Sequence, residues 1–279
     1  MSRIWNFPLS LHSENKGTGG TGLDQFSGAP YNNLAREIIQ NSLDARKNKN
    51  QPVIVEFHSF STPIEYFPGI ESFGRYAFQM NNQYSKNPNV SKEDKTVAQN
   101  TMKAALQKQV QWLRISDFNT TGLWGSTTPE TQNTAWFAFI HGAGRNQKSA
   151  KSGGSKGLGK NAIFVNSVIR SLFVSTYAHN DKNNSDEIAS IGIAKLLSVT
   201  DETDNSSNPD WTQGIGYCVE DNAEARKLNS PTSDFLHLDE TFDREAEGYG
   251  TDIFLPFFTN DEDWRYFLSY ETLMSFMPA

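Results

Sequence analysis

The segment Leu34-Ala-Arg-Glu-Ile-Ile-Gln-Asn-Ser-Leu-Asp-Ala45 has the apolar spacing of an α-helix. Within it, Glu37, Asn41 and Asp44 are four and three residues apart, so a helix places all three on one face. Two carboxylates and an amide beside apolar neighbours make a poor core, but they could hold a metal ion and a water molecule. An ordinary amphipathic helix with a solvated polar face is the alternative.

A second informative segment is Trp112-Leu-Arg-Ile-Ser-Asp117, which alternates like a buried strand and ends in an aspartate. The residues that follow it, Phe-Asn-Thr-Thr-Gly122, predict a loop. An aspartate after a strand is usually only a turn former, so Asp117 taken alone is a weak indication of a binding site.

A third segment is rich in glycine: Gly153-Gly-Ser-Lys-Gly-Leu-Gly-Lys-Asn-Ala-Ile-Phe164. Its glycines lead into an apolar run that predicts a helix from Asn161 to Val168. Glycines allow backbone N–H groups to approach phosphate oxygens, and a helix N-terminus adds positive partial charge. Lys156 and Lys160 add full positive charge. A flexible surface loop is the alternative.

The same stretch nearly satisfies a different phosphate-binding pattern, the P-loop Gly-x-x-x-x-Gly-Lys-Ser/Thr, over residues 154–161. Two features disfavour a P-loop. Asn161 replaces the hydroxyl residue that would hold Mg²⁺. The preceding residues, 144–152, are polar and do not form the buried strand that a P-loop follows.

The pattern Glu37-x-x-x-Asn41-x-x-Asp44-Ala45 resembles the first motif of the GHKL ATPases, whose nucleotide site is called the Bergerat fold. This superfamily includes type II topoisomerases, MutL and MORC proteins, the large heat-shock chaperone and sensor histidine kinases. The resemblance implies that ATP and Mg²⁺ bind here. It assigns the general base to Glu37 and the Mg²⁺ ligand to Asn41, and it places Asp44 and Ala45 within the nucleotide site.

The other segments follow in the family's order. By resemblance, Asp117 accepts a hydrogen bond from the adenine amino group, and Thr251 lies near it. In the family pattern Asp-x-Gly-x-Gly, Asn119 replaces the first glycine and the next glycine is displaced to Gly122. The glycine-rich segment resembles the family's lid, which assigns nucleotide contacts to Gly153, Gly154, Ser155, Lys156, Gly157, Leu158, Gly159 and Lys160.

The resemblance covers roughly residues 25 to 258 and implies an α+β fold. We expect a Bergerat-type two-layer sandwich, with helices packed on one face of a mixed β-sheet. The expected organisation is an N-terminal arm at 1–30, an ATPase domain at 31–258 with an insertion at about 60–111, and a C-terminal helix at 259–279 that leads into a downstream region. The arm is expected either to cross a partner subunit or to be a disordered lead-in.

Composition limits the classes of function. The chain has 279 residues, of which 37% are hydrophobic, and a net charge of −7, so its whole surface is not a nucleic-acid footprint. Its one cysteine, Cys218, fits a reducing cytoplasm. We find no apolar run of membrane-spanning length, no signal-peptide core and no metal-site spacing of histidines. We therefore expect a cytoplasmic protein without a membrane partner.

These expectations combine into a Mg²⁺-dependent ATPase that acts as a conformational and dimerisation switch. We expect it to form a nucleotide-dependent homodimer and to serve a nucleic-acid-directed machine, such as genome maintenance or antiviral (anti-phage) defence, through a nucleic-acid or effector partner. Two alternatives remain open. One is a histidine-kinase-type catalytic domain. The other is a nucleotide-sensing module without hydrolysis, which Asn119 favours.

Overall fold

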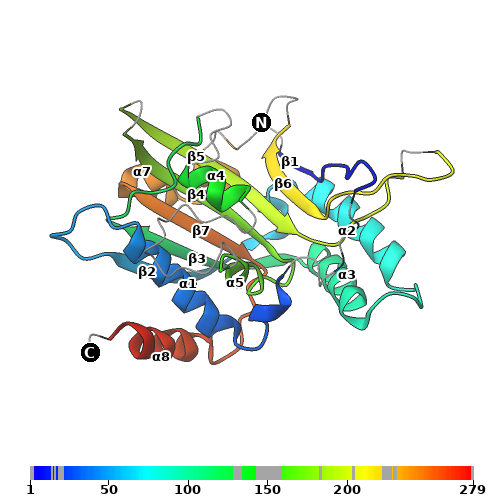
Figure 1. Cartoon of the computed structure of the whole chain (residues 1–279), viewed down its shortest axis with the longest axis horizontal. Helices are drawn as coiled ribbons and strands as arrows, with labels where there is room; N and C mark the ends of the chain where they lie inside the picture. Colours follow the sequence, from blue (N-terminus) through cyan, green and yellow to red (C-terminus); the bar gives the residue numbers. More distant parts are fainter. Residues whose placement is uncertain are drawn as a thin grey trace.

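The structure is a computed structural model, and Figure 1 shows its path. It describes residues 3–13, 15, 17, 22–127, 134–142, 159–181, 184–202, 205–221, 228 and 231–277. The strands are β1 (Arg3–Asn6), β2 (Ile54–Pro63), β3 (Gln109–Phe118), β4 (Ser171–Asn180), β5 (Ser185–Lys195), β6 (Ile215–Glu220) and β7 (Gly250–Pro256). The α-helices are α1 (Pro30–Asp44), α2 (Ile70–Tyr84), α3 (Lys92–Ala105), α4 (Ala135–Ile140), α5 (Asn161–Phe164), α6 (Thr232–Leu236), α7 (Arg244–Glu247) and α8 (Trp264–Phe276). Short 3₁₀ turns are η2 (Asp24–Phe26), η3 (Ile64–Tyr66) and η4 (Glu240–Phe242).

The described strands form a seven-stranded sheet in the order β1-β6-β5-β4-β7-β3-β2, and every neighbouring pair is antiparallel. The α+β class is confirmed, but the expectation of a mixed sheet is wrong. One reason for the antiparallel arrangement is the short link between β4 and β5, which consists only of residues 181–184. A parallel neighbour would need a crossover of about a dozen residues or more.

Helices cover both faces of the sheet, so the expectation of helices on one face is also wrong. The adjacent residues Trp112 and Leu113 of β3 belong to different buried clusters, as do Phe173 and Val174 of β4. Because successive strand side chains point to opposite faces, each face carries apolar groups that need a cover. Buried residues of α1, α4, α5 and α8 cover one face, and those of α2, α3 and α6 cover the other.

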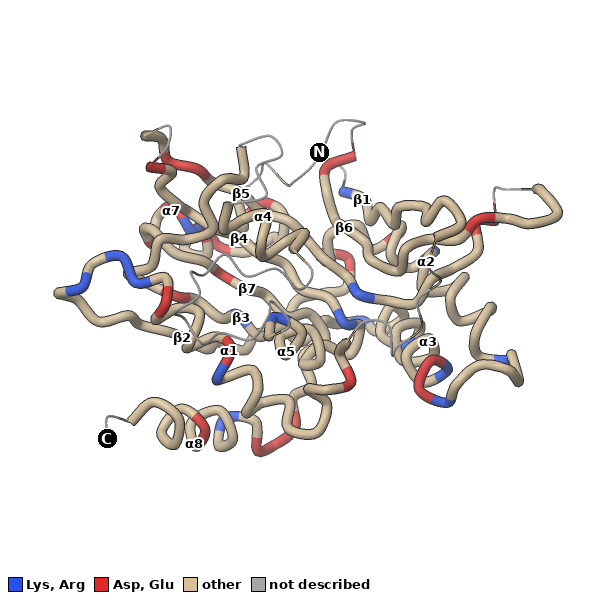
Figure 2. The backbone as a smooth tube through the Cα atoms, in the orientation of Figure 1, with Lys and Arg blue, Asp and Glu red and all other residues tan. Residues whose placement is uncertain are grey.

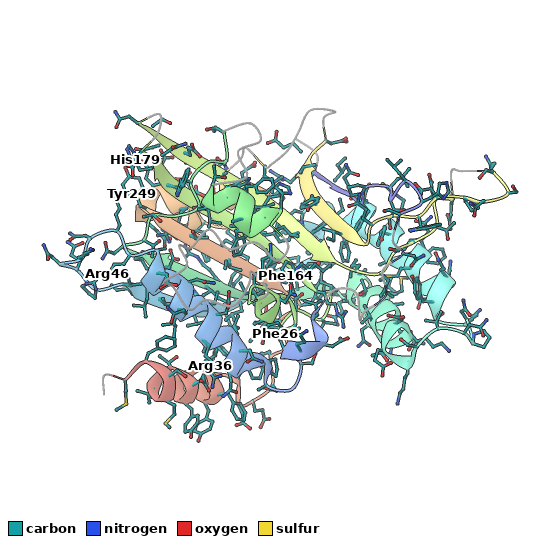
Figure 3. All side chains as sticks on the ribbon, in the orientation of Figure 1. Phe26, Arg36, Arg46, Phe164, His179 and Tyr249 are labelled. Carbon is teal, nitrogen blue, oxygen red and sulfur yellow. The ribbon has the colours of Figure 1, made fainter. Side chains whose placement is uncertain are left out.

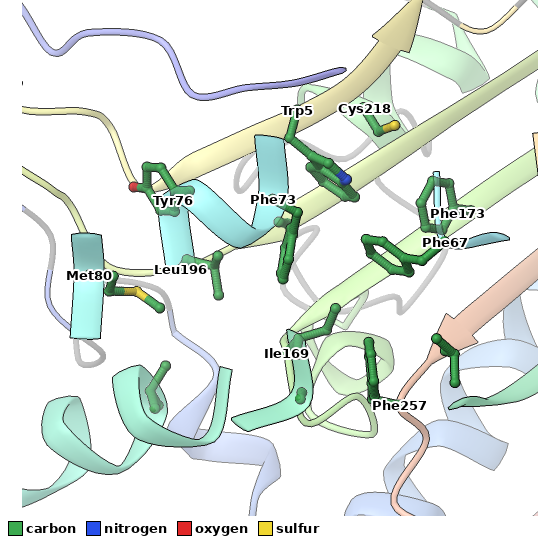
Figure 4. Packing of buried hydrophobic residues seen from close by; sticks show 14 of the residues in the cluster. Trp5, Phe67, Phe73, Tyr76, Met80, Ile169, Phe173, Leu196, Cys218 and Phe257 are labelled. Carbon is green, nitrogen blue, oxygen red and sulfur yellow. The ribbon is translucent and has the colours of Figure 1, made fainter. Parts of the chain in front are cut away.

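The face under α2 and α3 is filled largely by aromatic side chains (Figure 4). The ring centroid of Trp5 lies 5.4 Å from that of Phe73 and 5.6 Å from that of Phe173. Trp5 belongs to β1, so residues 3–6 of the expected arm form an edge strand paired with β6. Residues 60–111, expected as an insertion, supply α2 and α3 and thus much of this core.

Among the described segments, none of the helices combines the length and the apolar character that crossing a membrane requires.

Candidate functional site

Helix α1 holds Glu37 and Asn41 at the edge of its buried face. Pro30 occupies the first turn, where its missing N–H and fixed φ suit a helix start. Leu34 and Ile38 are buried against the sheet. Glu37 is half-buried and Asn41, one turn later, is exposed. Asn41 Nδ2 donates to Glu37 Oε1 at 2.8 Å, so the two residues of the predicted motif share one face.

Asp117 lies at the end of β3, where α1, β3 and β7 meet. Its Oδ1 accepts hydrogen bonds from the Thr251 backbone N–H at 2.7 Å and from Thr120 Oγ1 at 2.7 Å. Its Oδ2 accepts a longer bond of 3.3 Å from Ser42 Oγ, on the residue after Asn41. The structure therefore brings Asp117 and Thr251 into contact and joins both to α1.

The backbone of Asp117 is fixed by Arg244, a fully buried residue that the sequence analysis missed. Arg244 Nη2 donates to the Asp117 carbonyl oxygen at 2.6 Å, and Nη1 donates to Asp252 Oδ1 at 3.2 Å. Burial raises the pKa of the Asp117 carboxyl above its ordinary value, while hydrogen bonds from Thr120 and Thr251 oppose that shift. A lone arginine in a polar segment has no spacing that would have identified it.

The loop after Asp117 keeps a left-handed backbone at the position where the family pattern has a glycine. Asn119 has φ +59°, a conformation that asparagine tolerates better than most residues. Its Nδ2 donates to three carbonyl oxygens of the loop 48–52 at 3.0, 3.0 and 3.2 Å. Gly122 has φ +64°, and a Cβ there would lie 2.6 Å from the Tyr177 carbonyl oxygen, so this position requires glycine.

The end of α1 is attached to the same loop. The Ala45 carbonyl accepts from the Thr121 N–H at 2.8 Å. Arg46 donates to backbone carbonyls of residues 49 and 51 (Figure 3). Asp44 is exposed and accepts from Gln40 Nε2 at 2.9 Å. Ala45 thus contacts the loop that follows Asp117, and Asp44 precedes it as the last residue of α1.

Most of the predicted lid, namely Gly153, Gly154, Ser155, Lys156, Gly157 and Leu158, lies outside the described residues. Its last glycine, Gly159, is described and lies directly against Glu37. A Cβ at Gly159 would be 1.9 Å from Glu37 Oε2. Only glycine fits there while Glu37 keeps its present rotamer, so the first and third motifs meet at this carboxylate.

Lys160 lies at the C-terminal end of α4. Its Nζ donates to the carbonyl oxygens of Phe139, at 2.9 Å, and of Gly142. This position suits a cation, because the last carbonyls of a helix lack partners within it. Burial lowers the pKa of Lys160 to about 8. The structure thus places the Lys160 ammonium on α4 carbonyls.

The predicted helix at 161–168 ends early, at Phe164. Asn166 Nδ2 donates to the carbonyls of Ala162 and Pro30, at 2.8 and 3.1 Å. Asn166 therefore links α5 to the start of α1, where the chain turns toward β4. Residues 161–164, which form α5, are buried, whereas Val168, at the end of the predicted helix, is 37% exposed.

The described residues contain no group of three or more His, Cys, Asp or Glu side chains that could hold a metal ion. Comparisons with models of protein families, with curated proteins and with solved structures find no match to this chain.

Proposed function

We propose that this chain binds ATP together with Mg²⁺ and hydrolyses it, with Glu37, Asn41, Asp117 and Thr251 forming the site. The observation that supports this most directly is the contact of Gly159 with the Glu37 carboxylate. These residues come from segments far apart in sequence that the GHKL resemblance assigned to one site. The hydrogen bond between Asp117 Oδ1 and the Thr251 N–H supports the same assignment independently.

The hydrogen bonds of Asp117 favour adenine as the base. Two donors at 2.7 Å engage Oδ1, whereas the described residues offer Oδ2 only Ser42 Oγ at 3.3 Å. Oδ2 therefore has capacity to accept from a ligand N–H. Adenine carries an exocyclic amino group, and guanine carries a carbonyl oxygen at the equivalent position. An ionised Asp117 should accordingly accept adenine and repel guanine.

Asn41 fits the kind of protein ligand that Mg²⁺ uses beside phosphates. Mg²⁺ usually keeps several waters and takes one or two protein oxygens along with phosphate oxygens, so no dedicated protein cage is needed. Asn41 is exposed, and its amide nitrogen donates to Glu37, which leaves the Oδ1 atom of the same amide for the ion. Bound there, the ion would neutralise negative charge on the phosphates.

Glu37 is the residue that we propose accepts the proton from the attacking water. Its two oxygens are held from different sides, because Asn41 Nδ2 donates to Oε1 and the Gly159 backbone lies against Oε2. A fixed carboxylate favours proton transfer because phosphoryl transfer depends mainly on positioning and charge stabilisation. Following the resemblance, we propose that hydrolysis resets a dimerisation switch in a nucleic-acid-directed machine.

A second candidate is nucleotide binding without hydrolysis. Asn119 favours it, because this residue replaces a glycine of the family pattern and its side chain donates to the carbonyl oxygens of the loop 48–52. The two functions make different predictions for phosphate release, although they share the same binding residues.

The test is to measure ATP binding and phosphate release for the wild-type protein, Glu37→Ala and the control Glu56→Ala. Glu56 is an exposed glutamate on β2, outside the site. We expect Glu37→Ala to bind Mg·ATP and to lose hydrolysis, because a general base contributes mainly in the transition state. Wild-type binding without phosphate release would favour the sensing function, and absence of ATP binding would refute both.

A further inference from the structure

Helix α8 is apolar on the side that faces away from the rest of the molecule. Its inner side buries Trp264 and Leu268 against the sheet and α1. Its outer side exposes large side chains at spacings that follow one helical stripe, namely Tyr266, Phe267, Tyr270, Leu273 and Met274, and the exposed Met277 follows as the extended C-cap. Phe267 lies at the edge of this stripe, where its ring stacks on Tyr31 of α1. Figure 1 shows α8 beyond α1, at the border of the fold. We call these six residues the α8 stripe.

The charged groups of α8 lie outside this stripe. Glu271 is buried on the α1 side, where it accepts hydrogen bonds from Asn32 and Arg36. Figure 3 shows Arg36 between the two helices. Arg265 lies over the Trp264 ring, 4.5 Å from its centroid, and donates to Ser59. Figure 2 shows how sparse the charged positions along α8 are.

We propose that the α8 stripe pairs with the α8 stripe of a second copy of this chain, as an antiparallel helix pair about a two-fold axis. Two-fold pairing brings a surface against itself, so like charges on that surface would repel. For a chain with net charge −7, an uncharged stripe avoids this repulsion. The stripe satisfies that requirement of self-association.

The exposed area also suits a dimer. The six side chains are between 39% and 67% exposed. Together they present on the order of 600 Å² per copy, the upper end of what a typical monomer leaves in one patch. Two copies would bury about 1,200 Å², the lower bound for a specific interface. The pairing places Tyr270 near Leu273 of the second copy at the centre, which predicts a reversible dimer.

Sedimentation equilibrium without nucleotide tests the proposal separately from the ATP site. We expect the wild-type protein to be largely dimeric at about 50 µM, since an interface at the lower limit of specific size belongs with weak, reversible complexes. Leu273→Glu should weaken the dimer about thirtyfold, because two charges would meet at its centre. Leu106→Glu is the control: Leu106 is 71% exposed and follows α3, away from the stripe.

Cysteine cross-linking locates the interface. Cys218 is buried, so Leu273→Cys places a reactive thiol on the stripe, and mild oxidation should join two copies. Leu106→Cys should stay monomeric on a denaturing gel. A wild-type protein that is monomeric at every concentration would overturn the proposal, whether or not it binds lipid vesicles through α8. Equal dimerisation of Leu273→Glu and the wild type would overturn it as well.

Discussion

Replacing Asp117 with asparagine changes the proposed adenine acceptor while leaving its size unchanged. In the structure, Oδ1 accepts from Thr251 N–H and Thr120 Oγ1. An asparagine can keep its own oxygen there. Its amide nitrogen then takes the place of Oδ2, beside the Ser42 hydroxyl, which is able to accept a hydrogen bond. The variant should therefore fold, and its defect should be confined to the ligand.

The expected loss of ATP affinity follows from the replacement of Asp117 Oδ2 by an amide nitrogen. An amide nitrogen cannot accept from the adenine amino group, so one hydrogen bond is lost and two donors face each other. A lost partner for a buried polar group costs about 1–3 kcal/mol, which corresponds to roughly ten- to hundredfold weaker binding of ATP. Asp117→Ala, in contrast, should also weaken folding, because the donors from Thr251 and Thr120 lose their acceptor.

Isothermal titration calorimetry of Mg·ATP into the wild-type protein and Asp117→Asn measures this loss. Thermal unfolding of the same samples shows whether the variant remains folded. Unchanged affinity in a folded Asp117→Asn protein would remove Asp117 from the site and refute the assignment of its Oδ2 to the base.

Three further predictions concern the same region. Burial raises the folded-state pKa of Asp117, so the stability associated with its neutral form is complete below about pH 4 and is lost as pH rises through the raised pKa. Asp117→Asn should therefore have a higher free energy of unfolding than the wild type at neutral pH but not at pH 3. Urea unfolding of both proteins at the two pH values measures this difference. Gly159→Ala should force the Glu37 carboxylate to move, and phosphate release should fall at least about tenfold with little change in melting temperature. Gly28→Ala is the control: no atom lies near a Cβ at this position, so phosphate release should be unchanged. Asn119→Ala should lower the free energy of unfolding by about 1 kcal/mol or more, because alanine is strained in the left-handed backbone and cannot donate to the loop 48–52. Equal free energies of unfolding for the variant and the wild type in urea would show that the Asn119 side chain contributes nothing to stability.

Local periodicity predicted individual elements well. The stretch from Leu34 to Ala45 was expected as a helix, and all but its last residue lies in α1. The alternating residues 112–117 lie within β3. Pairing was harder to predict, because hydrogen bonds between strands depend on residues far apart in sequence. Val174 lies opposite Ile253, for example, and neither segment alone indicates that its partner runs antiparallel.

For the candidate site too, the sequence indicated individual residues better than the contacts between distant segments. The residue types and their order indicated Glu37, Asn41, Asp117 and Thr251, and the structure brings Asp117 into contact with Thr251. Sequence could not predict contacts that depend on the packing of α4 and α7. Positive charge suggested that Lys160 faces a phosphate, yet its Nζ donates to carbonyls at the end of α4.

Competitive binding of ATP and GTP to the wild-type protein in the presence of Mg²⁺ tests the central claim most directly. We propose that Asp117 Oδ2 is the acceptor that faces the base where adenine carries an amino group and guanine carries a carbonyl oxygen. We therefore expect saturable binding of ATP to one site per chain and an affinity for GTP at least about tenfold weaker, since a carboxylate facing a carbonyl leaves both without a donor. Equal affinity for the two nucleotides, or no binding of either, would contradict it.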